Sequence, residues 1–196
     1  MIDTPLVGDS TNIQPRAYSI ASAPHEQHLQ FLIKRNPVGR FGQFLETIEE
    51  GSELTIKGPL GLFTIKPTTR KILFVATGAG LAPFRSQILS LLVSNHPRSM
   101  TLIHGVASEQ DLFCTKELDA WQQKHPQFSW TATFSDQPSH AHHRSGRVQA
   151  HLASLIEDPL DTDLYVCGNP AMMKEVKELG LALGIPRQQV HGEGFV

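Results

Sequence analysis

Residues 71–85, KILFVATGAGLAPFR, decide the fold of this chain. Residues 72–76 form a short, uninterrupted apolar run, which is typical of a strand buried on both faces of a parallel sheet. Gly78 and Gly80 let the backbone approach a ligand closely, and Pro83 suits the first turn of a helix. This combination makes a site for phosphate or another anion. Packing turns use the same glycines, and the third glycine of the dinucleotide fingerprint is absent, so the stretch alone leaves both interpretations open.

Strands and helices alternate from residue 71 to the end of the sequence. We expect strands at 72–76, 101–106, 128–134, 163–167 and near 188–195, and helices at 83–93, 114–124, 147–156 and 170–183. Such alternation implies right-handed βαβ units and therefore a doubly wound parallel sheet. The pattern changes near Pro67, which predicts one domain over residues 1–67 and an α/β domain over residues 68–196.

The N-terminal part has a different pattern. Residues 1–15 are rich in turn-forming residues and predict a loop. Alternating patterns predict antiparallel strands at 17–22, 29–33, 54–56 and 62–65, with a short helix over 41–48 that ends at Gly51. Three or four strands are too few to close a six-stranded barrel, so we expect an open wall.

Composition excludes several classes of protein. The chain has 196 residues, 40% of them hydrophobic, and a net charge of −2 without a long run of one sign, which argues against a nucleic-acid partner. No apolar stretch is long enough to span a bilayer and the start lacks a signal-peptide pattern, so we expect a cytoplasmic protein. Cys114 and Cys167 have no CxxC spacing, and His140, His142 and His143 lack partner ligands, so neither a disulfide nor a metal site is expected.

Two marked stretches follow strands of the expected parallel sheet. Thr77-Gly78-Ala79-Gly80 closes the first strand, and Cys167-Gly168-Asn169-Pro170 closes a later one, while His104-Gly105-Val106 closes a third. Ligands of open α/β sheets bind beyond the carboxyl ends of the strands. The first two stretches each supply a glycine and a helix start at this edge, which suits an extended, phosphate-bearing ligand.

Seven short motifs, in this order and at about this spacing, resemble the ferredoxin-NADP reductase superfamily. They are RAYS at 16–19, Gly39 before a short helix, GPLG at 58–61, TGAGLAPF at 77–84, HGV at 104–106, CGNPAM at 167–172 and EGF at 193–195. The resemblance implies a partial antiparallel FAD-binding barrel followed by a doubly wound NAD(P)-binding domain. It also implies an oxidoreductase of EC class 1, which passes hydride from NAD(P)H to FAD and electrons on to a ferredoxin, flavodoxin or oxygenase component.

The same resemblance implies roles on the flavin side. Arg16 would pair with the FAD pyrophosphate, Tyr18 would lie against the isoalloxazine ring, and Ser19 would approach its N5 atom. Gly39, Gly42 and Gln43 would bring backbone N–H groups to the pyrophosphate. Without the other motifs, Arg16 and Tyr18 would be interpreted as a surface arginine and a half-buried strand tyrosine.

On the nucleotide side, Cys167 and Glu193 resemble the thiol and the carboxylate near the nicotinamide, and with Ser19 they are the expected catalytic residues. An inert buried thiol and a solvated carboxylate are the alternatives. Phe195 is the candidate for the aromatic ring that the nicotinamide displaces from the flavin. The remaining expected cofactor-binding residues are Thr77, Gly78, Gly80, Pro83, Asp136, Gly168 and Met172.

Two choices stay open at this stage. Asp136 follows Ser135 where NADPH-using relatives commonly place an arginine, which favours NADH, although Arg144 and Arg147 follow and would supply positive charge if the loop folds back. An incomplete barrel also leaves a second function open, a flavin-free nucleotide-binding or assembly subunit of a larger redox complex. A dehydrogenase acting directly on a small substrate is a poorer interpretation, because no acid–base pair has suitable spacing.

Overall fold

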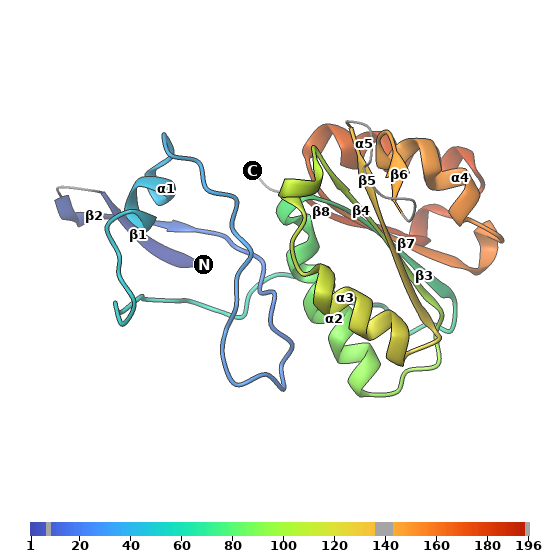
Figure 1. Cartoon of the computed structure of the whole chain (residues 1–196), viewed down its shortest axis with the longest axis horizontal. Coiled ribbons are helices and arrows are strands. Elements are labelled where there is room, and N and C mark those ends of the chain that lie inside the picture. The colour runs from blue at the N-terminus through green and yellow to red at the C-terminus, as the bar shows by residue number, and fades with distance from the viewer. Residues whose placement is uncertain (7–8, 136–142, 195–196) are drawn as a thin grey trace.

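A parallel sheet forms the larger part of the molecule (Figure 1). The computed structural model describes residues 1–6, 9–135 and 143–194. Six strands lie in the order β6-β5-β4-β3-β7-β8. Their bounds are β3 Lys71–Thr77, β4 Met100–Val106, β5 Phe128–Phe134, β6 Arg144–Ser145, β7 Thr162–Gly168 and β8 Val190–Gly194. All five pairings between neighbouring strands are parallel, so their carboxyl ends share one edge.

Helices cover both faces of this sheet. The α-helices are α2 Leu81–Val93, α3 Thr115–Lys124, α4 Leu152–Leu155 and α5 Pro170–Ala182, and short 3₁₀ turns span Gly78–Gly80, Glu109–Asp111, Val148–His151, Pro159–Asp161 and Arg187–Gln189. One core joins α2 and α3 to the sheet and contains Phe74, and the other joins α4 and α5 to it and contains Val75. Among the described residues, no helix combines the length and apolar character needed to cross a membrane.

The expected α/β architecture is confirmed, and each expected strand and helix from residue 71 onward has a counterpart within a few residues. Residues 72–76 lack alternation because helices cover both faces of the sheet at β3, so side chains on both faces are buried. The helix expected at 147–156 is instead a 3₁₀ turn followed by the four-residue α4. Strand β6 was not expected, since two residues are too few to show a period.

A buried ionic cluster lies at the amino ends of the strands, opposite the carboxyl edge. Asp163 of β7 is fully buried and accepts hydrogen bonds from Arg98 Nη2 at 2.5 Å, from Arg70 Nε at 2.8 Å and from Thr68 Oγ1. Burial alone would raise the pKa of Asp163, but the bonds from Thr68 and Arg70 hold it below its usual value. The chain that connects the N-terminal part to β3 is therefore tied to the sheet.

The N-terminal part begins with a hairpin, so the loop expected at 1–15 is wrong. Strands β1 Ile2–Leu6 and β2 Asp9–Arg16 pair antiparallel, and helix α1 Arg40–Leu45 packs on β1. Pro5 and Pro15 lie within these strands. A two-stranded sheet consists only of edge strands, where a missing N–H group is tolerated, so the prolines do not prevent pairing.

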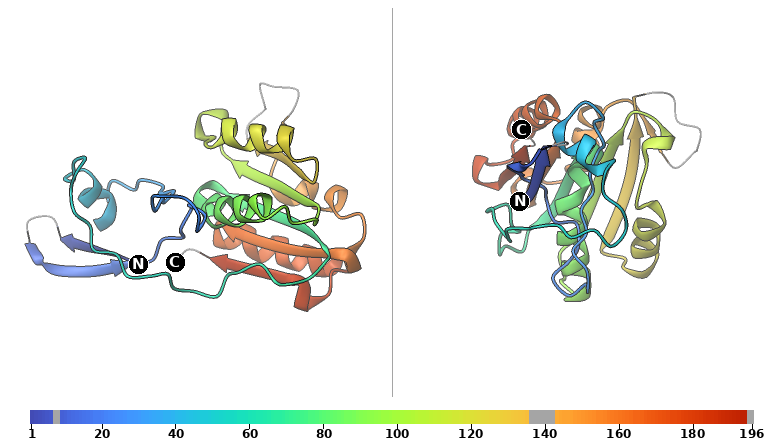
Figure 2. Two further views of the ribbon diagram at one scale, coloured as in Figure 1. Left: turned by 90° about the horizontal axis from the view of Figure 1, so that it is seen from below. Right: turned by 90° about the vertical axis from the view of Figure 1, so that its left-hand side faces the viewer.

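The four strands expected between residues 17 and 65 are wrong as well. Only single bridges form there, between Ile20 and Phe31 and between Ile2 and Ile56. Each segment has a neighbour on one side at most, so no ladder extends from these bridges. The described residues of the N-terminal part therefore form no closed barrel (Figure 2). Its exposed large apolar residues are Ile13, Leu29, Val38, Leu54, Ile56, Leu60 and Leu62.

Candidate functional site

The order of the strands marks a crevice at the carboxyl edge of the sheet. The chain continues from β3 through β4, β5 and β6 on one side and then returns to β7 on the other side of β3. Helices α2 and α5, which follow β3 and β7, therefore lie on opposite faces. Such a switch point is where open α/β sheets bind ligands. The turns after Thr77 and Cys167 lie here side by side, as expected from the sequence.

These two turns are in direct contact. A Cβ atom on Gly80 would lie 2.2 Å from the carbonyl oxygen of Cys167, and one on Gly168 would lie 2.3 Å from Thr77 Oγ1. Asn169 N also donates to Thr77 Oγ1 at 3.0 Å. Gly80 and Gly168 are thus required for close packing between the ends of β3 and β7, a reason that the sequence alone does not separate from ligand binding.

The two helix starts differ in what they offer a ligand. No side chain caps the turn Gly78–Gly80 or the first residues of α2. In contrast, Asn169 Oδ1 accepts from Ala171 N at 2.9 Å and Met172 N at 3.3 Å, so the start of α5 is already capped. Leu81 N at the start of α2 already donates to the carbonyl oxygens of Gly78 and Ala79, so the uncapped N–H groups on this side are those of the turn Gly78–Gly80. Gly78 has φ +50° and no atom within 4 Å of a built Cβ, so its turn has an open surface.

His104 forms a hydrogen bond with Gly78, the first glycine of this turn. Its Nε2 lies 3.0 Å from the carbonyl oxygen of Gly78, and its side chain is fully buried. Burial lowers the pKa of His104 to about 4, although the Gly78 carbonyl acts in the opposite direction, so the imidazole is neutral and Nε2 carries the proton. The sequence analysis named the HGV motif but did not predict that His104 binds the Gly78 carbonyl. The signal that could have predicted it is a polar residue inside an otherwise apolar strand.

Ser19 and Glu193 meet at the carboxyl edge, although 174 residues separate them in the sequence. Ser19 Oγ donates to Glu193 Oε1 at 3.0 Å. The GPLG turn also lies here, because a Cβ on Gly61 would be 3.8 Å from Glu193 Oε2. Three motifs from the N-terminal part and the last strand therefore converge on one place.

Cys167 lies in the same edge and is fully buried. Burial, together with the nearby negative charge of Glu193, raises the pKa of the Cys167 thiol to about 12. The sulfur is consequently protonated at neutral pH, and it is a weak hydrogen-bond donor rather than a nucleophile.

The remaining residues expected on the flavin side lie around α1 and β2. Tyr18 is half-buried, and its ring centroid lies 4.6 Å from that of Phe41 at an angle of 39°. Burial raises the pKa of Tyr18. Arg16 ends β2 with an exposed side chain and donates to Gln14 Oε1 at 3.0 Å. Tyr18 and Arg16 thus remain accessible.

Gly39 precedes α1 and Gln43 is exposed, whereas Gly42 is buried. A Cβ on Gly42 would lie 1.8 Å from the carbonyl oxygen of Asn36, so this glycine serves packing. The sequence missed Arg40, whose Nη2 donates to Asn12 Oδ1 at 2.8 Å while its buried Nε has no partner in the described chain.

Two of the expected ligand residues are buried, and two others are not described by the structure. Pro83 and Met172 are buried at the starts of α2 and α5. Asp136 and Phe195 lie outside the described residues. His140 and His142 do so too, and the described part of the chain holds no group of three or more residues that could bind a metal ion.

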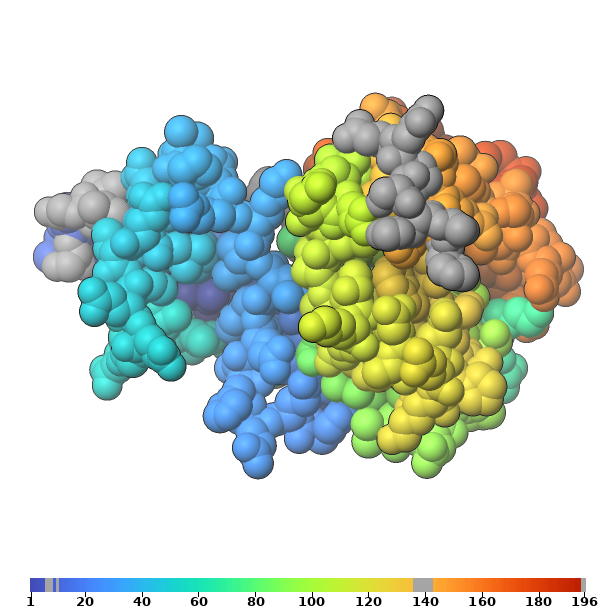
Figure 3. All heavy atoms as spheres, in the orientation of Figure 1, coloured from blue at the N-terminus to red at the C-terminus, as the bar shows by residue number. Residues whose placement is uncertain are grey.

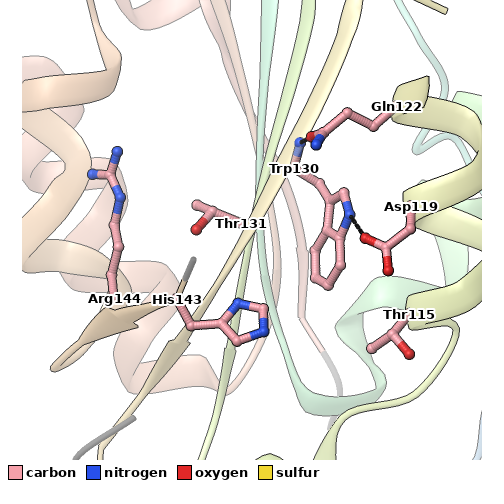
Figure 4. Close-up of a pocket in the computed structure, with 7 residues that line it drawn as sticks. All are labelled: Thr115, Asp119, Gln122, Trp130, Thr131, His143 and Arg144. Carbon is pink, nitrogen blue, oxygen red and sulfur yellow. Dashed lines mark hydrogen bonds between the residues drawn. The ribbon is translucent and has the colours of Figure 1, made fainter. Parts of the chain in front are cut away.

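A separate hollow of about 580 Å³ lies between α3 and β5 (Figure 4). Trp130 lines it and donates from its indole nitrogen to Asp119 Oδ1 at 2.9 Å (Figure 4). The lining residues are Thr115, Asp119, Gln122, Trp130, Thr131, His143 and Arg144. Arg144 donates to Ser154 Oγ at 3.0 Å, and Arg147 is exposed. None of the expected catalytic residues lines this hollow.

Comparison with known proteins agrees with this geometry. Residues 74–178 match the oxidoreductase NAD-binding domain family, and residues 5–65 match the oxidoreductase FAD-binding domain family. The chain is 32% identical to ferredoxin–NADP reductase B of Sorangium cellulosum, covering 92% of this chain and 78% of that protein. It is 30% identical to reductase component 1 of terephthalate 1,2-dioxygenase from Comamonas sp, covering 93% of this chain.

The crystal structure of the FAD/NAD-binding domain of nitric oxide dioxygenase from Vibrio cholerae has the same fold. The two share a TM-score of 0.89 at 22% identity, over 99% of this chain and 82% of that one. The chain spans only 55% of the Comamonas reductase component, and thus about half the length of that relative.

Proposed function

This chain belongs to the ferredoxin-NADP reductase superfamily, and we propose that it is a flavoprotein oxidoreductase that passes hydride from NAD(P)H to FAD. The observation that carries the proposal is the hydrogen bond between Ser19 and Glu193. It joins the motif expected to hold the flavin to the sheet edge expected to hold the nicotinamide. Two cofactors bound at these places would meet at this bond.

The residues present suit a nicotinamide nucleotide. The turn Gly78–Gly80, which no side chain caps and which is open at Gly78, offers backbone N–H groups to a pyrophosphate. His104 supports this assignment, because its bond to the Gly78 carbonyl fixes the orientation of the turn. When bound, the nicotinamide would supply the hydride that the flavin accepts.

The N-terminal part also suits FAD. The buried Nε of Arg40 lacks a partner among the described residues, and a phosphate oxygen would satisfy it. The exposed guanidinium of Arg16 and the half-buried ring of Tyr18 would hold the pyrophosphate and the isoalloxazine ring. We assign the pyrophosphate to Arg40 together with Arg16, Gly39 and Gln43.

Ser19 and Cys167 would act on the reacting atoms in different ways. The hydroxyl proton of Ser19 points to Glu193, so its oxygen presents lone pairs to a ring N–H group. The protonated thiol of Cys167 places no charge beside the nicotinamide. Glu193 thereby fixes the orientation of Ser19, and Cys167 adds no second negative charge to that of Glu193.

The electron acceptor follows by similarity only. The Comamonas relative is the reductase component of a dioxygenase, and we propose a ferredoxin, flavodoxin or oxygenase component as acceptor. We place the boundary between the FAD-binding and NAD(P)-binding parts at Pro67 and expect NADH to be preferred through Asp136. Two free cysteines, Cys114 and Cys167, support a reducing, cytoplasmic location.

A visible absorption spectrum of the purified chain tests the proposal. With FAD present, the protein should be yellow, and NADH or NADPH should bleach the flavin band under anaerobic conditions. Ferricyanide should then be reduced with continuous turnover. A colourless protein that also fails to bleach added FAD would refute the proposal.

The open N-terminal part supports a second candidate, a flavin-free nucleotide-binding or assembly subunit of a larger redox complex. Leu62 is 90% exposed and Val38 is 83% exposed, so this part has apolar surface that a partner would cover. This candidate predicts NAD(P) binding without bleaching of FAD. A titration that shows no affinity for NADH or NADPH would refute it.

A further inference from the structure

Three consecutive residues of α2 hold the N-terminal part in place. Each donates a side-chain hydrogen bond to a backbone carbonyl of that part. The bonds run from Arg85 Nη1 to Ala21 O at 2.7 Å, from Ser86 Oγ to Ser22 O at 2.8 Å and from Gln87 Nε2 to Phe63 O at 2.8 Å. Figure 3 shows the light-blue N-terminal segment lying against the C-terminal domain. One turn of helix thus sets the position of two separate segments.

Arg85 makes the strongest of these contacts. Its side chain is 6% exposed and lies between two carboxylates, Glu26 of the N-terminal part and Glu117 of α3. Glu26 accepts at 2.8 and 3.0 Å, and Glu117 accepts at 2.8 and 2.6 Å. The hydrogen bond with Glu26 raises the pKa of Arg85, and the same bond lowers the pKa of Glu26. Arg85 and Glu26 are therefore both charged near neutral pH.

Arg85 lies in α2 close to the glycine turn, so its contacts connect this turn with the N-terminal part. Arg85 lies four residues after Leu81, where α2 leaves the glycine turn, or about 6 Å along the helix axis. Residues 21–26, which Arg85 holds, begin two positions after Ser19 in the sequence. A single helical turn therefore separates the expected nucleotide site from the residue that holds the flavin-side segment.

We propose that Arg85 is a positioning residue for hydride transfer, which acts through Glu26 to fix Tyr18 and Ser19 relative to the turn at Gly78. This inference rests on the proposed function. Glu117 belongs to the same domain as Arg85 and orients the guanidinium without reaching the flavin side. Of the two carboxylates that bind Arg85, only Glu26 belongs to the N-terminal part. A displacement of about 1 Å between reacting groups costs about 100-fold in rate.

Glu26→Gln and Glu117→Gln form a matched pair of variants. Each removes one charge from the same arginine, and the two carboxylates are similarly exposed, at 20% and 31%. Glutamine at position 26 retains an oxygen for the bond that Ala23 N donates at 2.7 Å, so the local turn is kept. The two variants differ only in whether the lost contact crosses between the parts.

The rate of flavin reduction by NADH or NADPH, measured by anaerobic stopped flow, tests the inference. We expect Glu26→Gln to slow this rate about 10-fold to 100-fold, with the Kd of FAD within about 2-fold of wild type. Glu117→Gln should stay within about 3-fold, and Arg85→Lys should fall between the two. Equal rates for Glu26→Gln and Glu117→Gln would overturn the inference while leaving the proposed function intact.

Hydrogen–deuterium exchange supplies a readout without cofactors. Amides of residues 17–26 should exchange faster in Glu26→Gln than in Glu117→Gln, at matched global stability. Arg98→Lys, which weakens the buried cluster at Asp163, is a control for general destabilisation and should leave this segment unchanged. Unchanged exchange in Glu26→Gln would refute the positioning role. If wild type itself does not reduce FAD, the proposed function fails and the role in hydride transfer fails with it, whatever the exchange shows.

Discussion

Gly80→Ala is the sharpest test of the contact between the ends of β3 and β7. Gly80 has φ −60° and ψ −11°, which alanine adopts without strain. The added Cβ would nevertheless lie 2.2 Å from the carbonyl oxygen of Cys167 and 2.8 Å from Gly168 Cα. These are backbone atoms, so no side-chain rotation relieves the overlap.

The size of the effect follows from these distances. Ordinary contact of a Cβ begins at 3.4 Å, so a starting distance of 2.2 Å requires the two turns to separate by about 1.2 Å. Overpacking of this kind costs about 1–3 kcal/mol of the free energy of unfolding. Displacing a bound nicotinamide by about 1 Å costs about 100-fold in the rate of flavin reduction.

Urea denaturation measures the first effect, and anaerobic stopped flow measures the second. Gly184→Ala is the matched control. Gly184 has φ +96° and follows the C-terminal end of α5, whose N-terminal end lies at the carboxyl edge. Alanine there should cost about 1–2 kcal/mol of stability through its backbone and leave flavin reduction within about 2-fold. A destabilised Gly80→Ala variant that reduces FAD at the wild-type rate would refute the reasoning.

Three further outcomes are expected. Asp163→Asn leaves Arg98 buried without a counter-charge and should cost about 3–5 kcal/mol at pH 7 by urea denaturation. Because the folded pKa of Asp163 is lowered, this difference should persist above about pH 4 and shrink as the pH falls further; a difference independent of pH would contradict it. The pKa of His104 is lowered from 6.5 to about 4 in the folded state, so the unfolded state takes up this proton first as the pH falls. The free energy of unfolding of the wild type should therefore decrease by about 3 kcal/mol from pH 6.5 to pH 4. That of His104→Gln should decrease much less over the same interval. Ser19→Ala should slow flavin reduction about 10-fold to 100-fold, since a hydrogen bond to a charged group contributes about 1.5–3 kcal/mol. An unchanged rate would show that Ser19 has no role in hydride transfer.

The accuracy of the sequence-based predictions followed the number of neighbours that each strand has. Strands β3 and β7 each lie between two others, so their apolar runs are continuous and their glycine turns are distinct. In the N-terminal part, β1 and β2 form a ladder only with each other and contain Pro5 and Pro15, so local composition predicted a loop. Isolated bridges left no period to detect elsewhere in that part.

The candidate site divides in a similar way. Ser19 and Glu193 were named because the chain resembles a known family, since no local pattern connects residues so far apart. Arg85 stood at the end of the first stretch quoted, next to the buried Phe84, yet its partners Glu26 and Glu117 fall in a turn and on a helix surface. A charged residue on the apolar face of α2 was the signal that the sequence contained.

The protonated state of Cys167 has a consequence for the durability of the protein. Reduced flavins react with oxygen and release peroxide, which attacks thiolates far faster than thiols. A thiol with a pKa of about 12 holds almost no thiolate at neutral pH, and no solvent reaches its side chain. With a flavin bound nearby, this sulfur would therefore survive many cycles of aerobic turnover, and alkylating reagents should modify Cys114 first.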